Sequence, residues 1–242
     1  MSYYKLKSCV VVISLLLCSL PNAHAQSVYI DFKFGAFYPT KLPGGLFPNV
    51  ALHKSLDRDG VLQWDVGVGA GYYRRSYREL VYVAGASPNT PANAEEIYFK
   101  RKIVPLQIKL SMKISLIEMN LPNFPGTRSV ARSGMSRATS LRDLGFIVRP
   151  YAAYFKLNSE EENPALNLSL SRAYKDWGWG SEFGMYLSAV NNVTTTISVL
   201  YNRAILQREE TDANASEGVA LPSAKEVKLH GFGFLLSMGW GF

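Results

Sequence analysis

The chain has 242 residues, of which 48% are hydrophobic, and its formal net charge is +7. Beyond the N-terminus no stretch reaches the roughly 18 consecutive apolar residues of a transmembrane helix, which excludes a helical membrane protein. The basic excess is mild and forms no clustered stripe, so no nucleic acid partner is expected.

Residues 1–25 have the pattern of a secretory signal peptide. Lys5 and Lys7 supply positive charge ahead of a short apolar run, and small residues precede a cleavage site after Ala25. Two domains are therefore predicted: a signal peptide over 1–25, and an exported domain over 26–242.

The alternative at this end is a lipoprotein with lipid attached at Cys18. Leu17 stands before that cysteine, where a small residue is expected, which favours ordinary cleavage. Cleavage after Ala25 also removes Cys9 and Cys18, so neither a disulfide nor thiol chemistry is expected in the mature protein.

Apolar and polar residues alternate with period two along the mature chain, which predicts β-strands. In 104–116, for example, every even position is apolar, whereas the odd positions hold Pro, Gln, Lys or Ser. The expected strands are 28–38, 48–56, 61–83, 97–117, 145–157, 177–190, 193–208 and 226–242. An even number of antiparallel strands places both ends of the chain on one side.

Two features favour a closed barrel over a soluble β-sandwich, which also alternates. Glycines cluster on the less apolar face, where a narrow barrel interior has little room. Aromatic residues also recur about nine positions apart, as in Trp64 and Tyr72, which matches the roughly 9–11 residues that cross a bilayer as a tilted strand. The predicted fold class is all-β: an eight-stranded antiparallel up-and-down transmembrane β-barrel.

The connections should alternate between short periplasmic turns and longer outer loops. Segments 57–60 and 191–192 have compact turn sequences, as expected on the periplasmic side. Segments 84–96, 158–176 and 209–225 are polar and acidic, and we expect them to be outer loops.

Residues 118–144 break this pattern, because they form a long basic insertion between strands four and five on the periplasmic side. Arg128, Arg132, Arg137 and Arg142 lie within it. One interpretation is a tolerated insertion. The other is a docking element for peptidoglycan, lipid phosphate or a periplasmic partner.

Charged residues on the inward parity of the strands predict an ion network in the lumen. Its members are Asp31, Lys33, Asp65, Lys109, Lys113, Arg149 and Glu182. Charges of both signs in one confined space should pair, because an unpaired buried charge costs several kcal/mol. Asp65 and Lys113 are expected at similar depth, as are Lys113 and Arg149. Such a network would plug the barrel; a narrow solute or proton path is the alternative interpretation.

Catalytic and metal sites find little support. His53 and Ser55 share one strand face, which is reminiscent of lipid A deacylases, but no third group is evident to orient the base. Segment 160–162 holds three glutamates that suit a solvated loop better than a calcium site. No catalytic residue, cofactor or metal site is predicted.

The C-terminal stretch 231–242 resembles the targeting signal of outer-membrane barrels. Segments 103–109 and 148–153 are similar to strands four and five of the small outer-membrane β-barrel family, which includes the OmpA/OmpX/OmpW-like proteins and the PorT-like barrels of Bacteroidetes. The resemblance implies a place in the outer membrane of a Gram-negative envelope, with membrane lipid and the barrel-assembly machinery as partners. It assigns an assembly signal to Phe232, Phe234, Leu236, Met238, Trp240 and Phe242.

The expected function is that of a non-enzymatic barrel with a plugged lumen, which has a structural or interaction role through its outer loops. It could belong to a secretion or envelope system. The alternatives are a narrow channel or apolar-solute conduit and, more remotely, a lipid A-modifying enzyme.

Overall fold

A computed structural model describes residues 28–40, 42–57, 61–83, 93–118, 141–189, 193–209 and 224–241. The predicted signal peptide, Phe242 and most of the predicted insertion over 118–144 lie outside the described residues. Within the described part, no helix is long and apolar enough to cross a membrane.

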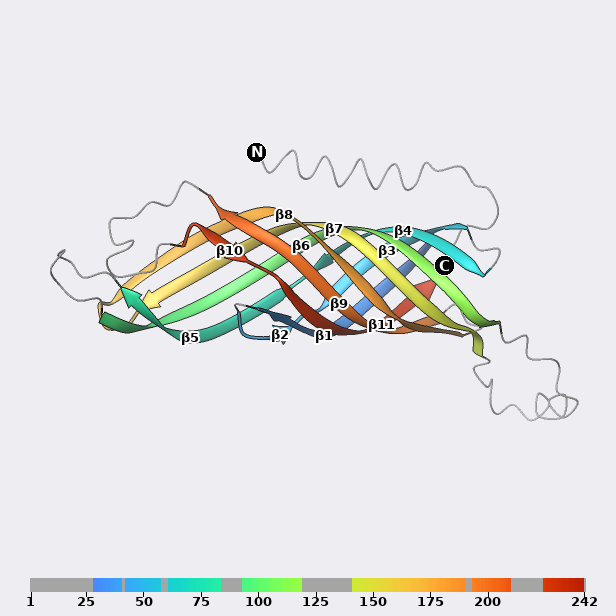
Figure 1. Ribbon diagram of the computed structural model, residues 1–242, viewed down its shortest axis with the longest axis horizontal. Coiled ribbons are helices and arrows are strands. Elements are labelled where there is room, and N and C mark those ends of the chain that lie inside the picture. Colours follow the sequence, from blue (N-terminus) through green and yellow to red (C-terminus); the bar gives the residue numbers. More distant parts are fainter. Residues whose placement is uncertain are drawn as a thin grey trace, which may run out of the picture.

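The strands form one ring, seen side-on in Figure 1. Their bounds are β1 (Val28–Pro39), β2 (Gly45–Leu46), β3 (Asn49–Asp57), β4 (Leu62–Gly71), β5 (Tyr73–Val83), β6 (Asn93–Glu118), β7 (Leu141–Asn163), β8 (Leu168–Ala189), β9 (Val193–Arg208), β10 (Glu226–Lys228) and β11 (Gly231–Gly241). Neighbours pair antiparallel in chain order, and pairing of β1 with β11 closes the ring. The eight-stranded antiparallel up-and-down barrel predicted from the sequence is confirmed.

Two of the eight strands are interrupted. The expected strand 61–83 divides at Tyr72 into β4 and β5, both of which pair with β6. The last expected strand similarly divides into β10 and β11, which both pair with β9. The short β2 pairs with β1 and was not predicted.

The expectation of an outer loop over 158–176 was wrong. Strand β7 continues to Asn163, and β8 begins at Leu168. The tight turn between them is held by the Asn163 side chain, which accepts hydrogen bonds from the backbone N–H groups of Ala165 and Leu166 at 3.1 and 3.3 Å. Asn167 adopts the left-handed conformation, with a φ of 52°, which asparagine tolerates well. The loop was mispredicted because the end of β7, 158–163, holds only polar and charged residues and so lacks apolar alternation.

The barrel is apolar outside and polar inside, the reverse of a soluble protein. Phe34, Phe183 and Phe234 point outward with 58%, 57% and 63% of their surface exposed. Inward positions hold the buried charged residues, several glycines and, on the outer side, an apolar cluster, and a side chain at Gly180 would collide with the Tyr151 hydroxyl. An exposed apolar belt of this extent is expected to contact lipid.

The outward face changes from apolar to charged at one level of the barrel, on the end away from the termini. On four strands an outward aromatic residue lies two positions away from an outward Lys or Arg, and the Lys or Arg is the one further from the termini. The pairs are Tyr72 and Arg74, Tyr154 and Lys156, Trp177 and Lys175, and Tyr201 and Arg203. Aromatic residues of this kind mark a membrane–water interface.

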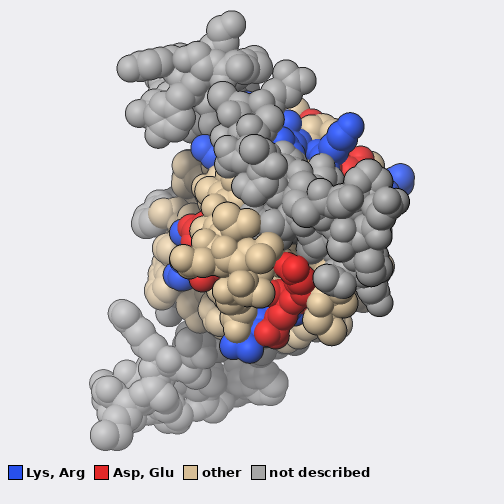
Figure 2. Space-filling view, turned by 90° about the vertical axis from the view of Figure 1, so that its left-hand side faces the viewer, with Lys and Arg blue, Asp and Glu red and all other residues tan. Residues whose placement is uncertain are grey.

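Beyond that level the longest strands continue as an extension. Strand β6 has 26 residues and β7 has 23, whereas a tilted strand needs roughly 9–11 to cross a bilayer. Figure 1 shows β5 with the far ends of β6, β7 and β8 at the left-hand end, opposite the C-terminus. Viewed from that end, the surface carries charged side chains of both signs (Figure 2).

Candidate functional site: the filled lumen

The structure places all seven residues of the predicted ion network in the barrel interior. Asp31 and Lys33 come from β1, Asp65 from β4, Lys109 and Lys113 from β6, Arg149 from β7 and Glu182 from β8. Six of the seven are buried, and the Lys113 side chain is 12% exposed. They converge because each lies on the inward parity of its strand.

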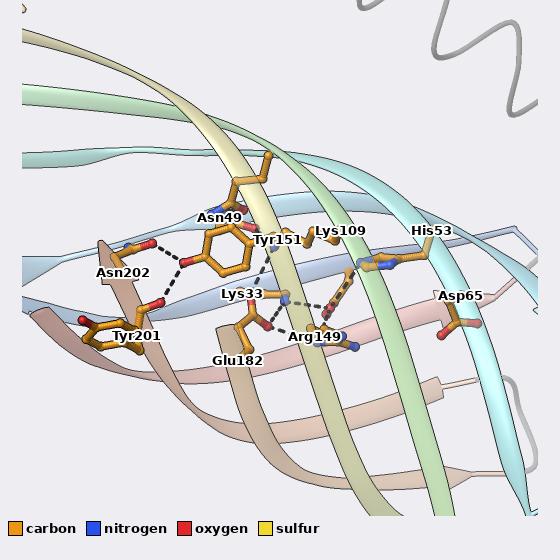
Figure 3. A network of polar contacts seen from close by, with 12 residues as sticks. Lys33, Asn49, His53, Asp65, Lys109, Arg149, Tyr151, Glu182, Tyr201 and Asn202 are labelled. Carbon is orange, nitrogen blue, oxygen red and sulfur yellow. Dashed lines mark hydrogen bonds and ion pairs between the residues drawn. The ribbon is translucent and has the colours of Figure 1, made fainter. Parts of the chain in front are cut away.

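Glu182 is the centre of the larger group of charges (Figure 3). Its carboxylate accepts hydrogen bonds from Lys33, from the Lys109 ammonium at 3.1 Å and from the Arg149 guanidinium at 3.4 Å. Asp31 lies 3.2 Å from Arg149 and 3.5 Å from the Lys33 ammonium. Two acids therefore balance most of the charge of three bases drawn from different sides of the barrel.

Asp65 forms a second, smaller group. The Lys113 ammonium lies 3.0 Å from its carboxylate, and the Tyr29 hydroxyl donates a hydrogen bond to it at 2.7 Å. Lys113 also sits 4.4 Å from the centre of the Tyr29 ring. Lys113 and Arg149, expected at similar depth, thus bind different carboxylates.

Sequence reasoning missed the neutral side chains that join these groups. Asn49 donates a hydrogen bond to Gln107 at 2.8 Å and accepts one from Lys109 at 3.3 Å, while the Tyr151 hydroxyl donates to Asn202. All four neutral residues occupy inward positions of expected strands, so their parity could have identified them. Their polar groups extend the network from the charges toward β9.

His53 is buried in the lumen, and its environment counts against the enzyme alternative. Its ring stacks on Tyr29 with centroids 4.8 Å apart, and Asp31 comes no closer to its Nε2 than 4.0 Å. Ser55 is also buried. A catalyst for membrane lipid needs access to the lipid-facing surface, which neither residue has.

An apolar layer fills the lumen on the outer side of the polar network. The segment after β1 folds inward, so that Leu42 and Phe47 are buried, and the Tyr73 hydroxyl donates to the Pro43 carbonyl. Phe37 packs against Phe47 and Tyr73 with ring centroids 6.1 and 6.3 Å away. These residues belong to one core cluster with Leu157, Leu200, Leu206 and Leu229.

The three glutamates expected in a solvated loop lie instead on β7. Glu161 is buried and lies 2.7 Å from the Arg172 guanidinium. Glu160 points outward to Lys100 and Lys102, at 2.7 and 3.3 Å. The hydrogen bond from Lys100 makes the largest contribution to lowering the pKa of its carboxyl, and the hydrogen bond from Lys102 makes the next largest. Among described residues, no group of acidic, histidine or cysteine side chains could hold a metal ion.

Comparison with known proteins finds no matching family model and no matching curated protein. Among solved structures, the chain is similar to a major outer membrane protein from Thermus thermophilus, with 13% identity, a TM-score of 0.49 and 90% and 100% of the two chains covered. It is also similar to Ail, the attachment invasion locus protein of Yersinia pestis, at 11% identity and TM-score 0.41, covering 90% and 97%. Neisserial surface protein A matches at 12% identity and TM-score 0.33, covering 88% and 94%.

Proposed function

We propose that the chain is a non-enzymatic outer-membrane barrel with a plugged lumen, which acts through the surface that it presents outside the membrane. Its role is structural or one of interaction, within an envelope or secretion system. Contact with a periplasmic partner or peptidoglycan through 118–144, and recognition of the C-terminal strand by the assembly machinery, belong to the same proposal.

The packing of side chains inside the barrel is the observation that supports this proposal. Five charged residues, with Glu182 at their centre, interlock across the barrel, and an apolar layer that includes Phe37 and Phe47 closes the outer side. Breaking a buried charge network costs several kcal/mol, so the plug should not open spontaneously. A plugged lumen leaves the exposed strands and loops as the means of contact with other molecules.

Planar-bilayer recording of the purified protein tests the plug, and we expect no large, steady conductance. Replacing Phe37 and Phe47 by alanine should increase current events because it empties part of the apolar layer. Phe34→Ala, at an outward-facing position, is the matched control and should cause no increase in current events. A large, steady conductance from the unaltered protein would contradict the proposal.

A narrow channel for a solute or for protons through the lumen is the second candidate function. It is favoured by buried polar atoms that lack hydrogen-bond partners among the described residues. They include both ring nitrogens of His53 and the hydroxyls of Ser111 and Ser237. In the same recordings, a small steady current that His53→Phe abolishes would support this path over the plug.

A further inference from the structure

Above the aromatic level, part of the inner face of strand β5 is exposed, although Ile97 and Phe99 on the neighbouring β6 are buried. Arg75 and Glu79 have the inward parity of Tyr73, yet both are exposed. The reason is that β5 pairs with β6 and with no other described strand, so no described strand continues the ring beyond its free edge. Arg75 can therefore be reached from outside, and Arg101 opposite it is partly exposed.

Two arginines lie directly opposite each other on this open face. Arg75 of β5 is paired in the ladder with Arg101 of β6, which puts their Cβ atoms roughly 4.5–5.5 Å apart. Like charges in this position repel. Among the ion pairs of the described residues, neither guanidinium is a partner, and the buried carboxylate of Glu161 on the same inner face lies 2.7 Å from Arg172.

Arg101 is held in place rather than free to turn away. Its guanidinium lies 4.9 Å from the centre of the Phe99 ring and 5.6 Å from that of Tyr77, and the two rings stack at 5.2 Å. Its Nε donates a hydrogen bond to the Ser159 hydroxyl at 3.3 Å. The terminal nitrogens of a fixed guanidinium remain as a planar fork of donors.

Tyr77 adds a neutral donor on the same face. Its hydroxyl is buried and has no hydrogen-bond partner among the residues described. Burial raises the pKa of this phenol to about 12, so the group stays protonated and able to donate at neutral pH. A buried hydroxyl without a partner is unfavourable, and a bound acceptor would remove that cost.

We propose that Arg75 and Arg101, with the Tyr77 hydroxyl, form a binding site for a phosphate monoester at the outer mouth of the barrel. Two opposed guanidinium forks supply the charge and paired N–H donors that suit a dianionic group with three terminal oxygens. The bound dianion would also remove the repulsion between the two arginines. The phosphate can belong to a lipid headgroup of the outer leaflet or to a soluble compound.

Titration calorimetry with inorganic phosphate, on the protein folded in zwitterionic micelles, tests the site. We expect saturable binding that Arg75→Gln and Arg101→Lys each weaken by about tenfold or more, since hydrogen bonds to charged groups are strong. Arg78→Gln is the matched control, because Arg78 lies on the outer face of β5 and pairs with Glu96 at 3.6 Å. Absence of saturable binding, or equal weakening by Arg78→Gln, would overturn the proposal.

Nanodiscs distinguish the two sources of phosphate. The titration is repeated in discs of phosphatidylcholine alone and in discs that also contain phosphatidic acid, whose headgroup is a phosphate monoester. A lipid ligand is identified if inorganic phosphate binds more weakly in the discs with phosphatidic acid than in those without it, and if Arg75→Gln abolishes this difference between the two kinds of disc. Equal binding in both identifies a soluble one. Binding that Arg75→Gln leaves unchanged in both discs refutes the site, whatever the state of the lumen plug.

Discussion

Glu182→Gln is expected to lower the free energy of unfolding from lipid vesicles by about 3–5 kcal/mol, the usual cost of removing one partner of a buried ion pair. The substitution keeps the shape of the side chain but removes the carboxylate that Lys33, Lys109 and Arg149 share, and of these three bases only Lys33 and Arg149 lie within 4 Å of Asp31. Urea titration followed by tryptophan fluorescence measures the loss.

Glu160→Gln is the matched control for this prediction. Glu160 also contacts two bases, Lys100 and Lys102, but all three side chains are exposed to water, and exposed ion pairs contribute little. Adding Lys109→Gln to Glu182→Gln should recover part of the stability, because it removes one unbalanced charge. If Glu182→Gln costs no more than Glu160→Gln, the lumen charges do not hold the barrel together.

Leu236→Arg is expected to lower the same free energy by about 2–4 kcal/mol, the cost of a base near the middle of the bilayer. Leu236 lies at the centre of β11, is 56% exposed and is flanked in the sheet by Phe34 and Ile197. The measurement is again urea unfolding from vesicles.

Ile205→Arg provides the comparison, because Ile205 also points outward but lies beyond Arg203, past the aromatic level. A base at or outside the interface costs about 0–1 kcal/mol. Equal losses from the two substitutions would show that the outward face of β11 is not in the bilayer interior.

The part of the barrel that crosses the belt could be predicted from sequence because its two faces differ so strongly. Phe232 and Phe234 alternate with Gly231 and Gly233, and that contrast indicated both the strand and its parity. The extension over 158–163 could not be predicted in this way. There Asn158 and Ser159 are both polar, and strand pairing depends on backbone hydrogen bonds that leave no hydrophobic pattern.

The members of the lumen network could also be predicted, since inward parity needs only the strand assignments. Which charges meet could be predicted only in part. The register of adjacent strands placed Asp65 near Lys113, but Lys33 and Glu182 come from strands that are not adjacent and meet across the lumen. The sequence also showed no sign that the segment containing Phe47 folds into the lumen. That fold depends on the space left inside the barrel on the outer side of the charged residues, which no local pattern reports.

A spin-label scan of 231–240 tests most directly whether the apolar outside of this barrel faces lipid and its polar inside is filled. The even positions, together with Leu235, Ser237 and Gly239 among the odd ones, are replaced in turn by a labelled cysteine in the mature protein, reconstituted in vesicles. Gly231 and Gly233 are left unchanged, because a Cβ there would collide with backbone oxygens of β1. Even positions should collide with oxygen dissolved in the bilayer, and odd positions should be immobile and shielded from both oxygen and a water-soluble nickel complex. Access of the nickel complex to the odd positions would show an open lumen, and access to the even positions would contradict the membrane barrel itself.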